Sequence, residues 1–421
     1  MNASRTTDML AIHGGRPVRQ SPLPNVLDPE GRTLGDEEIA ALERVVRSAH
    51  LWRVDGAETT ALEKEFAAMH GGEHAIAASS GTAALHLALA AVDPEPGDEI
   101  ITTPLTDFGT IIPILAQNAV PVFADVDPHT GNLDPASVEK MVSERTRAIV
   151  VVHLFGAAAP VQELQQIARR HDLMLIEDCA QAYLARPPAS DGLVGTYGDI
   201  GCFSLQQSKH ITCGDGGLVL CKDAELTRRM RLFADKGWPR DTGTRTHLHL
   251  GLNYRITELQ AAVARAQLKK LETVVERRRA TASRIITGVG GLPGLRWPAS
   301  PERHSFWLLP MLIDSPTGAD NHAWAEALNA EGVPASAGYI QAPVYSYPAF
   351  AERRTFGASG FPLTTPPARA EALEPPACPV AERLVESSLV TLGCNEGWSA
   401  SDADDVVEAV TKVHAGLRPP G

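Results

Sequence analysis

A single lysine stands in a glycine-rich loop between two apolar segments. Lys209 follows the strand-like run 200–205, and the Gly-Asp-Gly-Gly run at 214–217 leads into the next apolar run, 218–221. Ser204 places a hydroxyl five positions before the lysine. Glycines let the backbone turn tightly and approach a ligand. A partly buried lysine amine titrates low enough to attack a carbonyl and form a Schiff base, so the loop predicts a nucleophilic amine rather than a solvated charge.

Two other stretches could work with this lysine. Glu177 and Asp178 end the apolar run 173–176, and paired acids at a strand end are typical of catalytic or metal sites, although they also cap helices. A Ser-Ser-Gly-Thr run at 79–82 joins a strand to a helix, and amides at a helix N-terminus bind phosphate. Taken alone, this second run is better explained by Ser80 as an ordinary helix N-cap.

Strand-like and helix-like segments alternate along the first half of the chain. Such alternation predicts an α/β fold with a mostly parallel sheet wrapped by helices, and sheets of this kind bind ligands at the carboxyl ends of their strands. The expected strands are 75–78, 99–102, 121–124, 148–153, 173–177, 200–205 and 218–221, and the expected helices are 82–92, 108–117, 135–142 and 161–171.

Three regions are expected along the chain. Residues 1–35 are proline-rich and predict an extended N-terminal arm, residues 36–280 form the large domain, and residues 281–421 form a smaller C-terminal α/β domain. A helix from residue 36 is expected to have Leu42, Val45 and Val46 as its apolar face. The last helix is expected over 402–414 with Ser401 as its N-cap.

Composition excludes several classes of protein. The 421 residues carry a formal net charge of −13, which disfavours nucleic-acid binding. No apolar run has the length of a membrane span, and residues 1–8 lack the apolar core of a signal peptide. The six cysteines form no Cys-x-x-Cys pair, so we expect a reduced, cytoplasmic protein. Two close histidine pairs, at 70 and 74 and at 247 and 249, have no third ligand beside them, so no metal site is expected.

The lysine loop resembles a known family. Phe203-Ser204, Lys209 and the Gly-Asp-Gly-Gly run are similar to the cofactor-binding loop of pyridoxal-phosphate-dependent sugar aminotransferases of the DegT type. The likeness continues in the family's order from Ser79 to Ala262 and includes a Gly-Leu-Asn-Tyr-Arg run at 251–255. The resemblance implies the fold type I architecture of these enzymes and pyridoxal 5′-phosphate as the cofactor.

The resemblance also implies roles for the matching residues. Lys209 would hold the cofactor as a Schiff base and move the proton during transamination, while Asp178 would face the pyridine nitrogen. Glu177 would have at most a supporting role, and Gln181 would face the cofactor. The remaining cofactor residues implied within one subunit are Ser80, Gly81, Thr82 and Ser204.

Two further positions depend on the resemblance alone. Phe108 would stack on the cofactor ring. A core phenylalanine is the alternative, and the neighbouring Asp107 leaves the alignment open by one position. Asn253 would reach the cofactor phosphate of the neighbouring subunit, which implies a homodimer, and Arg255 would either assist there or support the fold.

The implied reaction transfers an amino group from L-glutamine or L-glutamate to a keto-cyclitol or keto-sugar in antibiotic or secondary-metabolite biosynthesis. The Trp-Arg pair at 52–53 and the Gly-Gly-Arg-Pro run at 14–17 resemble the branch that aminates cyclitols. A nucleotide keto-sugar is the alternative acceptor, and Arg53, Arg240 and Arg245 could bind its diphosphate.

Two other classes stay open. One is a sugar dehydratase of the same fold, in which histidine replaces the lysine, and His210 stands next to Lys209. The other is a non-catalytic sensory or binding protein. Asp215, where the family more often has Glu, and the run 338–341, in place of a histidine-containing loop, depart from the family pattern and leave the substrate open.

Overall fold

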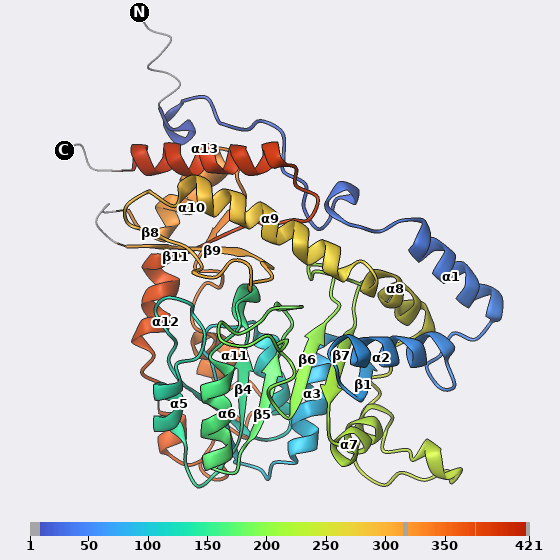
Figure 1. Ribbon diagram of the computed structural model, residues 1–421. Helices are drawn as coiled ribbons and strands as arrows, with labels where there is room; N and C mark the ends of the chain where they lie inside the picture. Colours follow the sequence, from blue (N-terminus) through green and yellow to red (C-terminus); the bar gives the residue numbers. More distant parts are fainter. Residues whose placement is uncertain (1–8, 315–318, 375, 418–421) are drawn as a thin grey trace, which may run out of the picture.

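A seven-stranded sheet, with the order β1–β7–β6–β5–β4–β2–β3, forms the centre of the large domain (Figure 1). Every neighbouring pair is parallel except those that include β7, which is antiparallel to both β1 and β6. The mostly parallel sheet expected from the sequence is therefore confirmed. Its strands are β1 His74–Ala78, β2 Glu99–Thr102, β3 Val120–Phe123, β4 Thr146–Val152, β5 Met174–Asp178, β6 Ile200–Ser204 and β7 Gly217–Cys221.

Helices cover both faces of this sheet because successive side chains of a strand point to opposite sides. In β1, Ile76 and Ala78 join the buried cluster under α3, α4 and α7, whereas Ala75 and Ala77 join the cluster under α2 and α8. Further along the sheet, α5 and α6 cover the second face. The bounds are α1 Asp36–Ser48, α2 Ala57–Met69, α3 Gly81–Val92, α4 Ile112–Ala116, α5 Pro135–Met141, α6 Val161–Arg170, α7 Ala224–Ala234 and α8 Glu258–Leu268.

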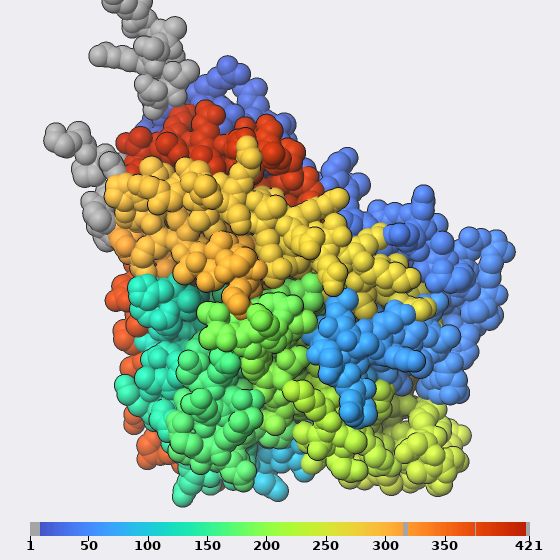
Figure 2. Space-filling model, in the orientation of Figure 1, coloured from blue at the N-terminus to red at the C-terminus, as the bar shows by residue number. Residues whose placement is uncertain are grey.

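A second sheet, with the order β10–β11–β9–β8, is antiparallel throughout. Its buried cluster includes Trp324 and Val410 from its helices and Leu10 and Leu23 from the N-terminal segment. In Figure 2 this blue N-terminal segment lies beside the red C-terminal helix. The elements are α9 Leu271–Val289, β8 Leu295–Arg296, β9 Leu309–Ile313, α10 Asn321–Ala330, β10 Ala335–Ala337, α11 Pro348–Ala351, α12 Pro379–Arg383, β11 Leu389–Leu392 and α13 Ala400–Gly416.

The computed structural model describes residues 9–314, 319–374 and 376–417. Residues 1–8 of the expected arm, and residues 315–318, 375 and 418–421 of the expected small domain, lie outside these ranges. Helix α9 runs without a break through the expected boundary at 280–281, and the division of the chain into domains at that point stays a prediction.

Two local expectations are wrong. Val45 is buried as expected, but Val46 is 62% exposed because α1 turns Ala41 and Val45 toward Ala262 of α8. Helix α13 begins at Ala400, and its N-cap is Ser399, whose hydroxyl accepts a hydrogen bond from the amide of Asp402. The capping signal was shifted by two positions because serines occur at both 399 and 401.

The long connection between β10 and β11 returns to the large domain. Val344 donates its amide to the carbonyl of Pro104, and Leu363 and Cys378 pack in one cluster with Leu105 and Phe123. This connection therefore brings small-domain residues to the carboxyl end of the large sheet. Within the described ranges, no helix combines the length and the apolar character needed to cross a membrane.

Candidate active site

A cavity of about 430 Å³ opens at the carboxyl ends of β4, β5 and β6, and we call it the lysine cavity. Its wall is formed by the N-terminus of α3, the loop after β2, the ends of these strands and the loop that carries Lys209. Trp307 and Tyr339 close it from the small domain. The site thus lies at the edge of the sheet where the topology of an open α/β fold places ligands.

Lys209 enters this cavity from the loop after β6. Its Nζ lies 4.1 Å from the centre of the Trp307 ring, and the Trp307 indole donates a hydrogen bond to the carbonyl of Ser208 at 2.8 Å. Burial lowers the pKa of Lys209 to about 8, although the charges of Asp178 and Asp107 act in the opposite direction. The amine is therefore far closer to its neutral, nucleophilic form at physiological pH than an ordinary lysine.

His210 does not share this position. Its side chain is fully buried, and its Nε2 donates to the carbonyl of Ser305 at 2.9 Å. Burial, followed by the charge of Arg278, lowers its pKa well below the ordinary value. The residue in the cavity is consequently the lysine, which argues against the dehydratase alternative.

Asp178 ends β5 and faces Lys209 across the cavity. One carboxylate oxygen accepts the Thr110 hydroxyl at 2.9 Å and the other accepts the amide of Ala180 at 3.1 Å. Burial raises the pKa of Asp178, while these hydrogen bonds and the charge of Lys209 partly offset the rise. Among the described residues, no cationic side chain forms an ion pair with Asp178. The carboxyl group is therefore available to pair with a cationic group of a ligand.

Gln181 lines the same wall. Its Nε2 donates to the Tyr339 hydroxyl at 3.0 Å, and its Oε1 accepts the amide of Phe155 at 2.7 Å. These two bonds fix the orientation of the side-chain amide and connect the large domain to Tyr339 of the small domain.

Glu177 points away from the cavity although it is adjacent to Asp178, because alternate residues of a strand face opposite ways. Its carboxylate accepts amides from Gly195, Tyr197 and Gly198 and a hydrogen bond from His153 Nε2 at 2.9 Å. His153 Nδ1 in turn accepts the amide of Ala159. The group of His153, Glu177 and Cys179 resembles a metal-binding set, but the histidine and carboxylate atoms already have hydrogen-bond partners. Glu177 thus anchors the loop that follows β5.

Helix α3 points its N-terminus at the cavity. The Ser80 hydroxyl accepts the amide of Ala83 at 3.0 Å, so Ser80 is indeed an N-cap while it also lines the cavity. In the described part of the chain, the amides of Gly81 and Thr82 have no acceptor. A Cβ at Gly81 would lie 2.7 Å from Cβ of Ser204, so glycine is required for this close approach. The result is a cradle of free amides beside the Ser204 hydroxyl.

The structure does not place Phe108 in the wall of the cavity. Phe108 packs into the neighbouring apolar cluster, with its ring centre 6.1 Å from that of Tyr347. Asp107 lines the cavity instead, and its carboxylate accepts the amide of Gly109 at 2.7 Å, which begins the short helix Phe108–Thr110. The local turn therefore exposes the residue one position before the expected aromatic.

Asn253 is exposed and lies outside the lysine cavity of its own chain. Its backbone pairs with that of Asp235. The Asp235 carboxylate forms ion pairs with Arg240 and Arg255, so Arg255 supports the local fold in this chain. The structure thus brings together Lys209, Asp178, Gln181, Ser204 and the 80–82 run, but not Phe108 or Asn253.

Sequence reasoning assigned no role to Trp307, and Tyr339 entered only within the run 338–341 that replaces a histidine-containing loop of the family. Trp307 lies just before β9 and Tyr339 just after β10, so neither is close in sequence to the lysine loop. An aromatic residue at the end of a short strand is the only sequence signal they carry.

The chain matches the DegT/DnrJ/EryC1/StrS aminotransferase family over residues 32–411 and therefore belongs to it. An L-glutamine:2-deoxy-scyllo-inosose aminotransferase of Streptomyces kanamyceticus is 38% identical over 427 residues, which cover 96% of each chain. Among solved structures, an aminotransferase from Psychrobacter cryohalolentis superposes with a TM-score of 0.82 at 29% identity, covering 94% of this chain and 100% of that one. A 3-amino-5-hydroxybenzoic acid synthase superposes with a TM-score of 0.79 at 29% identity, covering 92% and 98%.

The protein is thus a fold type I, pyridoxal-phosphate-dependent aminotransferase. The geometry of the lysine cavity fits this cofactor. The amides at the start of α3 suit the phosphate of the cofactor. The buried Asp178 carboxyl has no ion-pair partner in the described ranges, and a protonated pyridine nitrogen would provide one. The Lys209 amine, whose pKa is lowered, is suited to react with the aldehyde of the cofactor.

Proposed function

We propose that this aminotransferase moves the amino group of L-glutamine to a keto-cyclitol of the 2-deoxy-scyllo-inosose class in an antibiotic or secondary-metabolite pathway. The names of its relatives support this substrate pair. The observation that carries the acceptor assignment is the charge of the lysine cavity.

The described lining of that cavity contains three carboxyl side chains, one lysine and no arginine. The three are Asp107, Asp178 and Asp215. A ring that bears several hydroxyls can donate hydrogen bonds to Asp107 and Asp215. A nucleotide diphosphate would instead require arginine or lysine partners and would be repelled by these carboxylates. The lining that a single subunit supplies therefore favours an uncharged polyol over a nucleotide-linked sugar.

Two residues carry the chemistry in this proposal. When bound, pyridoxal phosphate supplies an aldehyde that takes up the amino group and a ring that stores the electrons released at the donor carbon. Lys209 would hold the cofactor through Nζ, and its amine would move the proton at the donor α-carbon. Asp178 would keep the pyridine nitrogen protonated, since a buried carboxylate is stabilised by an adjacent positive charge.

The other residues bind and orient. The amides of Gly81 and Thr82, with the Ser80 and Ser204 hydroxyls beside them, would bind the phosphate. Gln181 would position Tyr339 at the substrate side of the cavity through their hydrogen bond. Phe108 is partly buried in the neighbouring apolar cluster, and its stacking role stays a prediction.

We propose further that the active enzyme is a homodimer in which Asn253 binds the cofactor phosphate of the neighbouring subunit. The phosphate and the donor carboxylate need more positive charge than Lys209 supplies. Three cations, Lys236, Arg240 and Arg245, surround the ring of Trp238 on the exposed segment that precedes Asn253. Apolar side chains elsewhere on the surface also support an interface: Ile39, Val46 and Trp52 are 63%, 62% and 50% exposed.

A subunit-mixing experiment tests this arrangement. Lys209→Ala and Asn253→Ala are each expected to be inactive alone. If Asn253 acts in the neighbouring subunit, a mixed dimer of the two variants contains one intact site, and random mixing restores about a quarter of wild-type activity. Absence of any recovery in a mixture shown by mass spectrometry to contain mixed dimers would place Asn253 in its own subunit's site or outside both.

We also place the enzyme in the cytoplasm. All six cysteines are free thiols, and five of them are buried. Free thiols are typical of proteins in a reducing compartment.

The substrate proposal is tested by two measurements on the purified enzyme with its cofactor. L-Glutamine should convert the visible absorbance of the cofactor to that of its amino form. Addition of 2-deoxy-scyllo-inosose should reverse the change, with an aminated cyclitol as product, whereas a thymidine-diphosphate keto-sugar should not. A reversal by the nucleotide sugar alone would overturn the cyclitol assignment and leave the aminotransferase class intact.

A further inference from the structure

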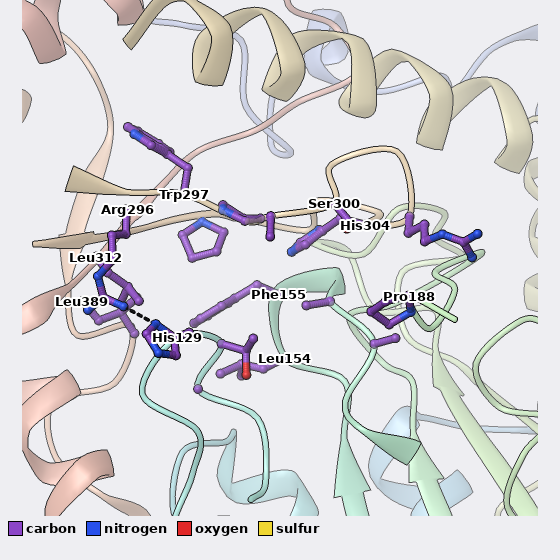
Figure 3. A pocket seen from close by; sticks show the side chains of 18 of the residues that line it. His129, Leu154, Phe155, Pro188, Arg296, Trp297, Ser300, His304, Leu312 and Leu389 are labelled. Atoms are coloured by element: carbon purple, nitrogen blue, oxygen red, sulfur yellow. Dashed lines mark hydrogen bonds between the residues drawn. The ribbon is translucent and has the colours of Figure 1, made fainter. Parts of the chain in front are cut away.

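A second cavity, of about 140 Å³, lies between the large and small domains, and we call it the interdomain cavity (Figure 3). Leu154 and Phe155, which follow β4, lie on one side of it, and Ser300 and His304 lie on the other. His129 and Arg296 meet at one end and Pro188 lies at the other. Leu312 of β9 and Leu389 of β11 complete the apolar wall. Nothing in the transamination reaction uses this space.

The size and apolar lining of the cavity suit a single ring. An engineered protein cavity of about 150 Å³ lined by aliphatic and aromatic side chains binds benzene. The interdomain cavity has a comparable volume, and its apolar side chains come from both domains. An apolar ring would therefore gain packing contacts with the side chains that form the apolar wall.

The charged side chains that line the interdomain cavity favour an anionic ligand. Its lining includes Arg186, Arg296 and Arg303, and none of the described lining residues is an aspartate or a glutamate. Arg296 is paired with Asp314, and Arg303 donates to the carbonyls of Pro187 and Ser190.

Arg186 differs from the other two arginines. Its guanidinium is half-buried and has no hydrogen bond or ion pair with any described residue. Burial, followed by the charge of Arg186, lowers the pKa of the neighbouring Arg279, and the charges of Glu276 and Glu302 offset this only in part. A carboxylate would pair with Arg186 in the bidentate geometry that guanidinium groups prefer.

One buried donor also lacks a partner. His304 is 4% exposed, and its Nδ1 accepts the amide of Phe306 at 2.9 Å. In the neutral ring Nε2 therefore carries the proton, and this N–H has no acceptor within the described ranges. A buried donor without an acceptor costs free energy, which an oxygen of a bound acid would recover after a small shift of the ring.

We propose that the interdomain cavity binds a compact hydrophobic carboxylate, with its ring against Leu154, Phe155 and Leu312 and its carboxylate on Arg186. The molecule is an aromatic or cycloaliphatic acid of one ring. This site is separate from the lysine cavity and goes beyond the proposed transamination.

Phe155 makes the two cavities neighbours. Its ring lines the interdomain cavity and packs edge-on against Tyr339 of the lysine cavity, with ring centres 5.1 Å apart. Its amide donates to Gln181 and its carbonyl accepts the amide of Trp307 at 2.8 Å. Its φ of 60° is unusual for an aromatic residue and is held by these contacts. An occupant that moves Phe155 therefore moves the wall around Lys209.

Binding is tested with 4-fluorobenzoate and the cofactor-loaded enzyme by ¹⁹F NMR titration. We expect saturable binding, and binding at least about tenfold weaker for 4-fluorobenzyl alcohol, which lacks the charge. Arg186→Gln should weaken the acid by about tenfold or more for the same reason. Ala299→Trp, at an exposed rim position, should block entry without disturbing the core. Arg169→Gln removes an exposed arginine outside both cavities and should change nothing.

Three results would overturn the proposal. The first is no saturable binding up to about 10 mM, a concentration that fills even weak sites. The second is equal affinity for the acid and the alcohol. The third is binding that survives both Arg186→Gln and Ala299→Trp, which would place the acid elsewhere, for example in the lysine cavity.

The coupling of the two cavities through Phe155 is tested by a separate measurement. The pH titration of the cofactor's visible absorbance should shift when 4-fluorobenzoate saturates the wild-type enzyme. Phe155→Leu keeps an apolar wall but removes the contact between the rings, so the shift should shrink or vanish. Bound acid with an unchanged titration in the wild type would refute the coupling.

Discussion

The lysine cavity and the interdomain cavity share a wall and have opposite chemistry. The first is polar, with Asp107, Asp178 and Asp215 around one lysine, and the second is largely apolar, with arginines at its rim. Phe155 borders the second and contacts Gln181, Trp307 and Tyr339 of the first. One short loop after β4 thus separates two unlike sites. The lysine cavity is acidic and suits a polyol and the protonated ring of the cofactor. The interdomain cavity is basic and suits a hydrophobic anion.

The difference follows from where each cavity lies. The lysine cavity is built at strand ends of a single sheet, where loops present polar side chains and free amides to a ligand. The interdomain cavity lies between the loop after β4 and strands β9 and β11, so buried leucines and Phe155 form its apolar wall, while other lining residues are exposed. The predictions below run from the largest expected effect to the smallest, and the first also measures binding at the other cavity.

The largest effect is expected from Lys209→Ala. The change removes both the covalent link to the cofactor and the amine that moves the proton, so turnover should fall by more than about 10⁴-fold. Steady-state assays with L-glutamine measure this loss. The interdomain cavity should still bind 4-fluorobenzoate with wild-type affinity. Lys140→Ala, at an exposed position on α5, serves as the control and should retain full activity. Substantial transamination by the Lys209 variant would refute the mechanism.

Asp178→Asn should reduce kcat by about 10²- to 10⁴-fold, because an amide cannot hold the pyridine nitrogen in its protonated form. Stopped-flow measurement of the half-reaction with L-glutamine isolates this step. The neighbouring Glu177 is expected to affect stability rather than catalysis. Glu177→Gln would leave the amides of Gly195, Tyr197 and Gly198 with a poorer acceptor and should lower the free energy of unfolding by about 2–3 kcal/mol. If Glu177→Gln instead impaired the half-reaction of the folded enzyme more than Asp178→Asn, the assignment of the two acids would be reversed.

Asp107→Asn should alter the reactivity of the lysine and the choice of acceptor. The charge of Asp107 favours the protonated amine, so its removal should lower the pKa of Lys209 below about 8. Cofactor capture, followed by absorbance across pH, should then reach half its maximal rate at a lower pH than in the wild type. The variant should also favour a nucleotide keto-sugar over the cyclitol by several-fold relative to wild type. An unchanged pH profile and an unchanged acceptor ratio would remove Asp107 from the site.

The smallest effect concerns acid stability. Burial lowers the pKa of His304 to about 3 and those of His70 and His86 to about 4. These side chains are neutral in the folded protein, whereas unfolded histidines gain a proton near pH 6.5. The unfolded state thus binds more protons below that pH, and stability present above pH 6.5 is lost as the pH falls toward 4.

His304→Asn tests this for the residue beside the interdomain cavity. Denaturant titrations between pH 7 and pH 4 should show a pH dependence reduced by at most about 1.4 kcal/mol per pH unit, the value for one proton. His322→Asn, at an exposed position on α10, is the control and should leave the slope unchanged. An equal slope in both variants would show that His304 titrates normally.

Much of the fold could be predicted because it depends on local patterns. All seven strands of the large sheet occur within two residues of their expected positions, since buried parallel strands appear as short apolar runs between helices. The lysine loop could also be recognised, because its chemistry is concentrated in one stretch. The error at Ser401 arose because the serines at 399 and 401 both fit the capping pattern, and Val46 was wrongly included in the apolar face beside the buried Val45.

The sequence by itself determined the order of strands and helices along the large sheet's part of the chain, the lysine loop, the acids at the end of β5 and the Ser-Ser-Gly-Thr run that begins α3. Only the tertiary structure decided that Asp107 rather than Phe108 lines the lysine cavity, because one hydrogen bond to Gly109 sets the direction of that turn. It alone placed Trp307 over Lys209 and built the interdomain cavity from segments that are far apart in sequence. Contacts between distant segments depend on how two sheets pack together, and no local spacing of residues encodes that packing.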